Sequence, residues 1–139
     1  MQALRLIAAL LVGCATAFAI AMVGFSILRS VWPAYAAAEP TKSYTLGMLF
    51  ARLGLAAVLT AGAACAATLV ARDGGQAAWW LGALFLVLSL PSHLHYVWND
   101  YPVWYHAAYL LSLVPIAGYS GRLFASALPR APLTQGVEA

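Results

Sequence analysis

The sequence predicts an all-α integral membrane protein whose four transmembrane helices form a four-helix bundle with antiparallel neighbours. Of its 139 residues, 64% are hydrophobic and only 8% are charged, whereas soluble domains carry roughly 25% charged residues. Because so few charges could not cover a water-soluble domain, most of the chain must face lipid. Four apolar runs, each long enough to cross a bilayer, are separated by short polar or proline-containing segments. The length allows a single transmembrane domain over residues 1–139.

The first expected span covers residues 4–28. Arg5 lies at its start and Arg29 follows its end, and about 25 residues are enough to cross a hydrocarbon core of ~30 Å with some tilt. A cleaved signal peptide is the alternative, because the alanines at 36–38 resemble a signal-peptidase site. The apolar region of a signal peptide is normally ~7–15 residues long, however, and Arg29 and Pro33 separate this run from the alanines. We therefore expect the first span to be retained.

The second expected span, residues 44–71, follows a predicted loop at 31–43 that Pro33 and Pro40 interrupt. This span is rich in small residues, which let helix backbones approach closely and so favour helix association in lipid. The small residues are Gly47, Ala51, Gly54, Ala57, Ala61, Gly62, Ala63, Ala66 and Ala67. We expect this span to lie at the centre of the bundle, or to pack against a second copy of the chain or a membrane partner.

The third and fourth spans are expected at residues 77–97 and 102–123. A polar turn at 72–76 precedes the third span, and a very short connection joins the two. Pro102 suits the first turn of a helix, where its missing N–H costs no hydrogen bond. Residues 129–139 are expected to form a loose tail.

Four spans would place both termini on the same side of the membrane. The basic residues on that side are Arg5, Arg72, Arg122 and Arg130, and those on the opposite side are Arg29 and Lys42. Basic residues are more frequent in cytoplasmic loops than in external ones. We therefore expect a multi-pass protein of the bacterial inner membrane with both termini in the cytoplasm.

Several function classes are disfavoured by what the sequence lacks. The net charge of +3 comes from scattered basic residues, so nucleic acid is not an expected partner. There is no H-E-x-x-H, G-x-S-x-G or P-loop motif and no pair of carboxylates for acid–base chemistry, so enzymatic activity is not expected. Cys14 and Cys65 lie inside apolar runs and outside any C-x-x-C motif, which indicates packed side chains.

Arg52 is the clearest candidate for a functional group, because it lies about two helical turns inside the second span. An ionisable side chain within a membrane is costly and is usually functional. Arg52 would either extend to the outer interface along its own aliphatic chain, or face the bundle and bind an anion such as a lipid headgroup or a carboxylate.

Three histidines lie near the outer turn. His93 and His106 are equally distant from the centre of this turn, so antiparallel helices would bring them to the same depth. His95 would point roughly the opposite way on a regular helix, unless Pro91 distorts it. A level pair suits haem or a metal ion, with Asp100 as the nearest acid, and proton transfer is another alternative. Interfacial hydrogen bonding is the simpler interpretation, and we expect no cofactor.

The segment at 101–106 is the most distinctive stretch of the chain. Tyr101, Trp104 and Tyr105 would form either a stacked aromatic wall for a quinone or lipid headgroup, or the aromatic girdle of the fourth helix. The girdle is the simpler interpretation. Together with the segments at 91–93 and 121–123 and with Pro115, this stretch resembles small four-span membrane proteins of bacteria to which no activity is assigned. The resemblance implies the four-span architecture and transfers no site residue.

These features support three functional hypotheses. The first is a non-enzymatic membrane subunit or homo-oligomer that packs through its second span. The second is a transporter or lipid- or anion-handling protein that uses Arg52. The third is a haem- or metal-binding redox protein that uses His93 and His106. The density of small residues and the scarcity of reactive groups favour the first, with the second close behind.

Overall fold

The computed structural model describes residues 2–128 of the chain. The expected tail at 129–139, which includes Arg130, lies outside the described residues. The described part contains helices and no strand, which confirms the predicted all-α class. Its elements are α1 (Gln2–Val31), α2 (Pro33–Ala38), α3 (Leu46–Ala71), α4 (Gln76–Pro91), a π-helical turn (Ser92–Tyr96), a 3-10 turn (Trp98–Asp100) and α5 (Val103–Ala127).

Three helical segments are long and apolar enough to cross a membrane, which indicates a membrane protein. They are α1, α3 and the continuous segment Gln76–Tyr96. The fourth long helix, α5, has 25 residues, but it is not among the segments that are apolar enough to cross a membrane. Polar side chains such as His106, Ser112 and Arg122 lower its mean hydropathy.

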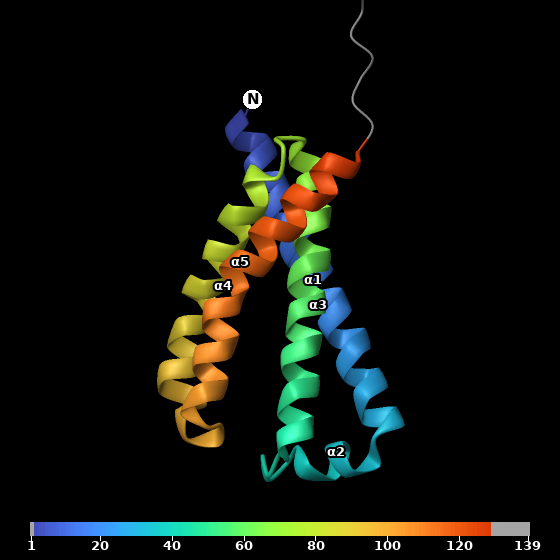
Figure 1. The fold of residues 1–139 in the computed structure, drawn as a ribbon, viewed down its shortest axis with the longest axis vertical. Helices are drawn as coiled ribbons and strands as arrows, with labels where there is room; N and C mark the ends of the chain where they lie inside the picture. The colour runs from blue at the N-terminus through green and yellow to red at the C-terminus, as the bar shows by residue number, and fades with distance from the viewer. Residues whose placement is uncertain (1, 129–139) are drawn as a thin grey trace, which may run out of the picture.

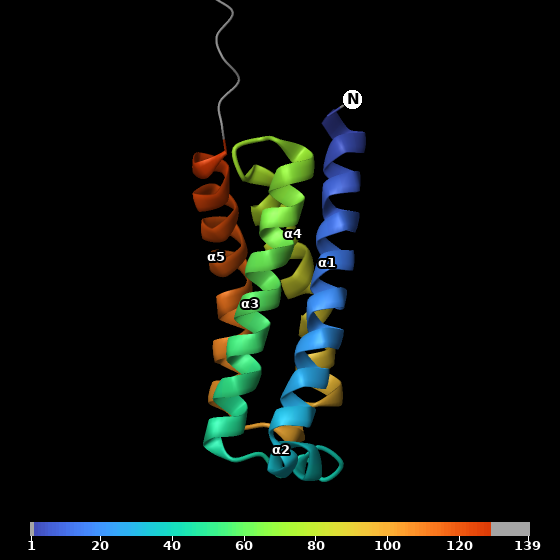
Figure 2. The same cartoon turned by 90° about the vertical axis from the view of Figure 1, so that its right-hand side faces the viewer.

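The long helices are arranged as two pairs. α1 packs chiefly against α3, and α4 packs chiefly against α5. Figure 1 shows the two pairs close together near the N-terminus and diverging toward the opposite end, where α2 lies. In Figure 2 the four long helices run side by side, with α2 below the ends of α1 and α3. Because α3 also contacts both α4 and α5, it is the central helix of the fold.

Small side chains fill the contacts that α3 makes. Ala63, Ala64 and Ala67 are fully buried. Ala63 and Ala67 belong to an apolar cluster with residues of α1 and α4, whereas Ala64 packs with Ala78 of α4 and Ala117 of α5. The most deeply buried small residues of this helix are therefore used within the chain, at the bundle centre.

The segment predicted as a loop at 31–43 contains the short helix α2, so that prediction is wrong in part. Pro33 occupies the start of α2, where a missing N–H leaves no acceptor unpaired. The alanines at 36–38 are the strongest helix formers. Tyr35 of α2 is fully buried and packs with Met48 of α3, and this burial holds the short helix against α3.

The turn between α4 and α5 also differs from the prediction. Pro91 ends the regular part of the helix, and the chain continues as the π-helical turn Ser92–Tyr96 instead of an α-helix to residue 97. Pro102 precedes α5 with an extended backbone (φ −66°, ψ 151°), because it caps the helix rather than forming part of its first turn. α5 then continues to Ala127, beyond the predicted end near residue 123.

Candidate functional site

A cavity of about 230 Å³ lies between the two helix pairs, toward the end of the molecule that carries α2. Phe25 of α1 and Arg52 of α3 line one side of it, and His93 of the π-helical turn lines another. Tyr105 and Tyr109 of α5 contribute further aromatic wall. All four long helical segments therefore contribute to one small cavity, which both polar and apolar side chains line.

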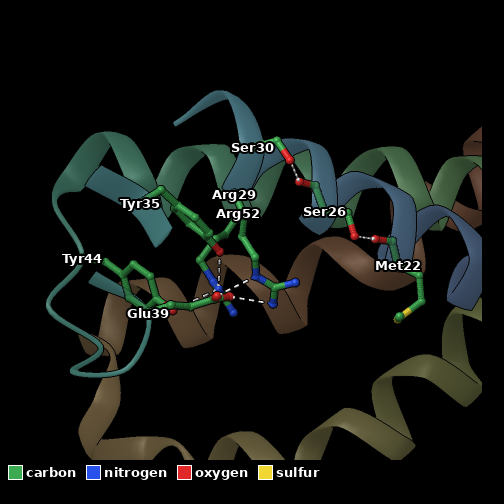
Figure 3. Close-up of polar contacts among 8 residues, drawn as sticks. All are labelled: Met22, Ser26, Arg29, Ser30, Tyr35, Glu39, Tyr44 and Arg52. Atoms are coloured by element: carbon green, nitrogen blue, oxygen red, sulfur yellow. Dashed lines mark hydrogen bonds and ion pairs between the residues drawn. The ribbon is translucent and has the colours of Figure 1, made fainter. Parts of the chain in front are cut away.

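Arg52 is held in this cavity by aromatic residues. Its Nη1 atom donates hydrogen bonds to the phenol oxygens of Tyr35 at 2.5 Å and Tyr44 at 3.3 Å, and Figure 3 shows these side chains converging. The guanidinium carbon also lies 5.2 Å from the ring centre of Phe25, 4.9 Å from that of Tyr44 and 5.5 Å from that of Tyr101, within the range of cation–π attraction. Its Nε atom is buried and has no hydrogen-bond partner among residues 2–128.

The positive charge of Arg52 has no carboxylate partner among residues 2–128. Glu39 lies nearby in Figure 3, but it is bound by Arg29 through two contacts, Nε–Oε2 at 2.6 Å and Nη2–Oε1 at 2.9 Å. This hydrogen bonding lowers the pKa of the Glu39 carboxyl, so the pair is ionised at neutral pH. Asp100 is likewise paired with Lys42. Glu39 and Asp100, the two acidic residues at this end, therefore form ion pairs with cations other than Arg52.

The phenols around Arg52 do not supply a counter-charge either. Burial raises the pKa of the Tyr35, Tyr44 and Tyr101 hydroxyls above the ordinary tyrosine value. All three side chains are therefore neutral at neutral pH. Arg52 is solvated by neutral oxygens and aromatic faces, which leaves its charge uncompensated.

The structure brings His93 and His106 into contact. Their Nδ1 atoms are 2.9 Å apart, and His106 Nε2 lies 3.2 Å from the backbone oxygen of Trp98. A carbonyl oxygen can only accept, so His106 Nε2 must carry a proton and donate it. In a neutral His106 ring, Nδ1 is then the acceptor, and His93 Nδ1 donates to it. This assignment leaves His93 Nε2 without a proton, on a side chain that lines the cavity.

His95 and Asp100 take no part in this pair. His95 is exposed, and Asp100 is bound to Lys42. Among residues 2–128, no three His, Cys, Asp or Glu side chains lie close enough together to hold a metal ion. The facing nitrogens of His93 and His106 form a hydrogen bond with each other.

Of the three residues expected as an aromatic wall, Tyr101 and Tyr105 line the cavity and Trp104 does not. Tyr101 and Tyr105 stack with their ring centres 4.8 Å apart, and both line the cavity. Trp104 instead packs against Phe50, with ring centres 5.6 Å apart, and remains 40% exposed. Tyr109 completes the wall by stacking on His93 at 4.4 Å. The four-residue spacing of Tyr101, Tyr105 and Tyr109 is a sequence signal that could have identified it.

No family model, curated protein or solved structure matches this chain.

Proposed function

We propose that this chain is a four-span membrane protein in which Arg52 binds the anionic group of a small organic acid or amphiphile. One observation carries the proposal: an uncompensated guanidinium lines a cavity between the helices, and its Nε–H has no hydrogen-bond partner within the described part of the chain. A charge kept within a membrane-spanning helix is expensive unless it is paired. An anion entering the cavity would supply the missing partner.

The cavity fits an anionic head better than a complete lipid or drug-sized molecule. Its volume of about 230 Å³ is below the roughly 300–1,000 Å³ of typical ligand pockets. Carboxylate and phosphate oxygens match the planar fork of an arginine. The aromatic rings of Tyr101 and Tyr105 would contact the adjoining apolar part of the ligand.

His93 adds a hydrogen-bond acceptor to this site. Its unprotonated Nε2 would accept a hydrogen bond from a hydroxyl beside the anion, such as the P–OH of a phosphate monoanion. The bond to His106 holds the His93 ring in this tautomer. Arg52 and His93 together favour a ligand with one negative oxygen and one proton-bearing oxygen.

The other two hypotheses have less support. The buried small residues of α3 contact other helices of the same chain, which reduces the surface available for a partner. The two Nδ1 atoms of His93 and His106 are hydrogen-bonded to each other at 2.9 Å, and His106 Nε2 donates to the backbone oxygen of Trp98. Only His93 Nε2 keeps a free lone pair, so the two histidines do not form a two-nitrogen ligand set for one metal ion or haem. We therefore rank anion handling above both a packing subunit and a redox protein.

The proposed topology has four spans, with both termini in the cytoplasm of a bacterial cell. Arg5, Arg72 and Arg122 cluster at the terminal end, whereas Arg29 and Lys42 lie at the α2 end. The positive-inside rule then places the Arg52 cavity in the outer half of the bilayer. A reporter fused after residue 128 should be cytoplasmic, and a tag inserted at 40–43 should be accessible from outside. Finding both on the same side would contradict four spans.

Calorimetric titration of the detergent-purified protein tests the ligand class. Hexyl phosphate should bind, whereas hexanol, which has the same chain and no charge, should bind at least about 10-fold more weakly. Inorganic phosphate distinguishes the two ligand sources. If it competes as well as hexyl phosphate, the ligand is a free anion; if it does not, the ligand is an amphiphile. Equal binding of hexanol and hexyl phosphate would contradict the proposal.

A further inference from the structure

A second, larger pocket lies at the opposite end of the molecule. Its volume is about 440 Å³, and it is lined by the first turns of α1, the end of α3 and the start of α4. Arg5 and Arg72 both line it, and no ion pair involves either guanidinium within the described residues. Asp73 also lines the pocket, but its carboxylate accepts hydrogen bonds from the backbone N–H groups of Gly75 at 3.1 Å and Ala77 at 2.7 Å. These hydrogen bonds orient the Asp73 carboxylate but leave its charge in place, so the two arginines give the lining of the pocket a net positive charge.

The backbone at Arg72 is a further unusual feature of this pocket. Arg72 ends α3 in the left-handed conformation, with φ 51° and ψ 43°. Glycine is the usual residue at such a position because a β-carbon is disfavoured there. An arginine thus occupies a place where glycine would be more stable, and its side chain lines the pocket.

An apolar groove adjoins this pocket. It has a volume of about 300 Å³ and lies between α1 and α4, where Leu10, Leu84 and Val87 contribute to its walls. Leu6 and Trp80 line both the pocket and the groove. From Trp80 to Val87 the groove follows α4 for about 10 Å at 1.5 Å per residue. A charged pocket therefore leads directly into an apolar groove that runs along the helices.

We propose that this pocket and groove bind an anionic phospholipid. The phosphate would lie between Arg5 and Arg72, and one acyl chain would lie along Leu10 and Leu84. Trp80, at the junction, is the residue type that favours the boundary between headgroups and acyl chains. This order of polar and apolar groups matches a lipid that enters from the cytoplasmic leaflet, where anionic headgroups attract basic residues. The site is separate from the Arg52 cavity and does not depend on the function proposed there.

Native mass spectrometry of the detergent-purified protein tests this site with phosphatidylglycerol and phosphatidylcholine as probes. Wild type should bind phosphatidylglycerol in preference. The double variant Arg5→Gln/Arg72→Gly, in which glycine preserves the left-handed turn, should bind it about 25-fold more weakly, or about 5-fold for each arginine. Arg122→Gln, which removes a cation at the same end outside the pocket, should bind as wild type does.

Three outcomes would overturn the lipid assignment. The first is an unchanged preference for phosphatidylglycerol in the double variant. The second is an equal loss in Arg122→Gln, which would indicate nonspecific attraction by charge. The third is competition by glycerol phosphate as effective as that by phosphatidylglycerol, because the acyl groove would then contribute nothing. Arg5→Gln alone provides a second measurement if the double variant does not fold.

Discussion

Replacement of Arg52 by glutamine is expected to weaken the binding of hexyl phosphate by about 10- to 100-fold, since hydrogen bonds to charged groups contribute about 1.5–3 kcal/mol. Glutamine keeps a polar side chain but removes the positive charge and the guanidinium fork. Lysine at the same position should restore part of the affinity, because it supplies the charge without the fork. Calorimetric titration of the purified variants measures both effects.

The matched control for this change is Arg122→Gln. Arg122 lies at the other end of the molecule, where its guanidinium stacks over Trp79 at 5.1 Å. Its removal should leave hexyl phosphate binding unchanged. Similar losses in Arg52→Gln and Arg122→Gln would show that the ligand senses overall charge, and the assignment of Arg52 as receptor would then fail.

Replacement of Gly82 by leucine is expected to destabilise the fold by about 3 kcal/mol, the upper end of the usual cost of overpacking. A β-carbon at residue 82 would lie 2.9 Å from the Cα of Val114 and from the Cβ of Ala117, and 3.2 Å from the backbone oxygen of Leu113. Most of these atoms belong to the backbone of α5 and cannot rotate away. α4 and α5 would have to separate.

Gly54→Leu is the control for this prediction, because it makes the same substitution in α3. A β-carbon at residue 54 would meet no atom within 4 Å, so we expect a change within about 0.5 kcal/mol. Denaturant titration in detergent micelles measures the free energy of unfolding of both variants. An equal effect at the two positions would mean that the close contact between α4 and α5 does not limit stability.

The long helices could be predicted from sequence because apolar runs of this length have few alternatives in lipid. The short helix α2 could not, since Pro33 and Pro40 are typical of a loop and the burial of Tyr35 depends on α3. From the sequence, Pro91 predicts a distortion of the helix, but it does not predict that the distorted segment is a π-helical turn. Helix ends at such turns depend on caps and tertiary contacts rather than on hydropathy.

The site was predictable to a similar extent. Arg52 can be identified from the sequence because a charge within an apolar run is rare. The equal distances of His93 and His106 from the centre of the turn can also be counted in the sequence. The hydrogen bonds of Tyr35 and Tyr44 to Arg52 could not be predicted, because aromatic residues at the ends of spans usually mark the membrane interface. Their convergence on Arg52 arises from the packing of α2 against α3, which no local pattern encodes.

Direct observation of the Arg52 guanidinium during ligand titration tests most decisively whether it is the anion receptor. In protein labelled with ¹⁵N-arginine, the Nε–H signal of Arg52 can be assigned by its loss in Arg52→Lys. Hexyl phosphate should shift this signal with a saturating dependence on concentration, because the buried Nε–H gains its missing acceptor, whereas hexanol should leave it in place. A signal that stays fixed while hexyl phosphate binds would contradict an anion site at Arg52.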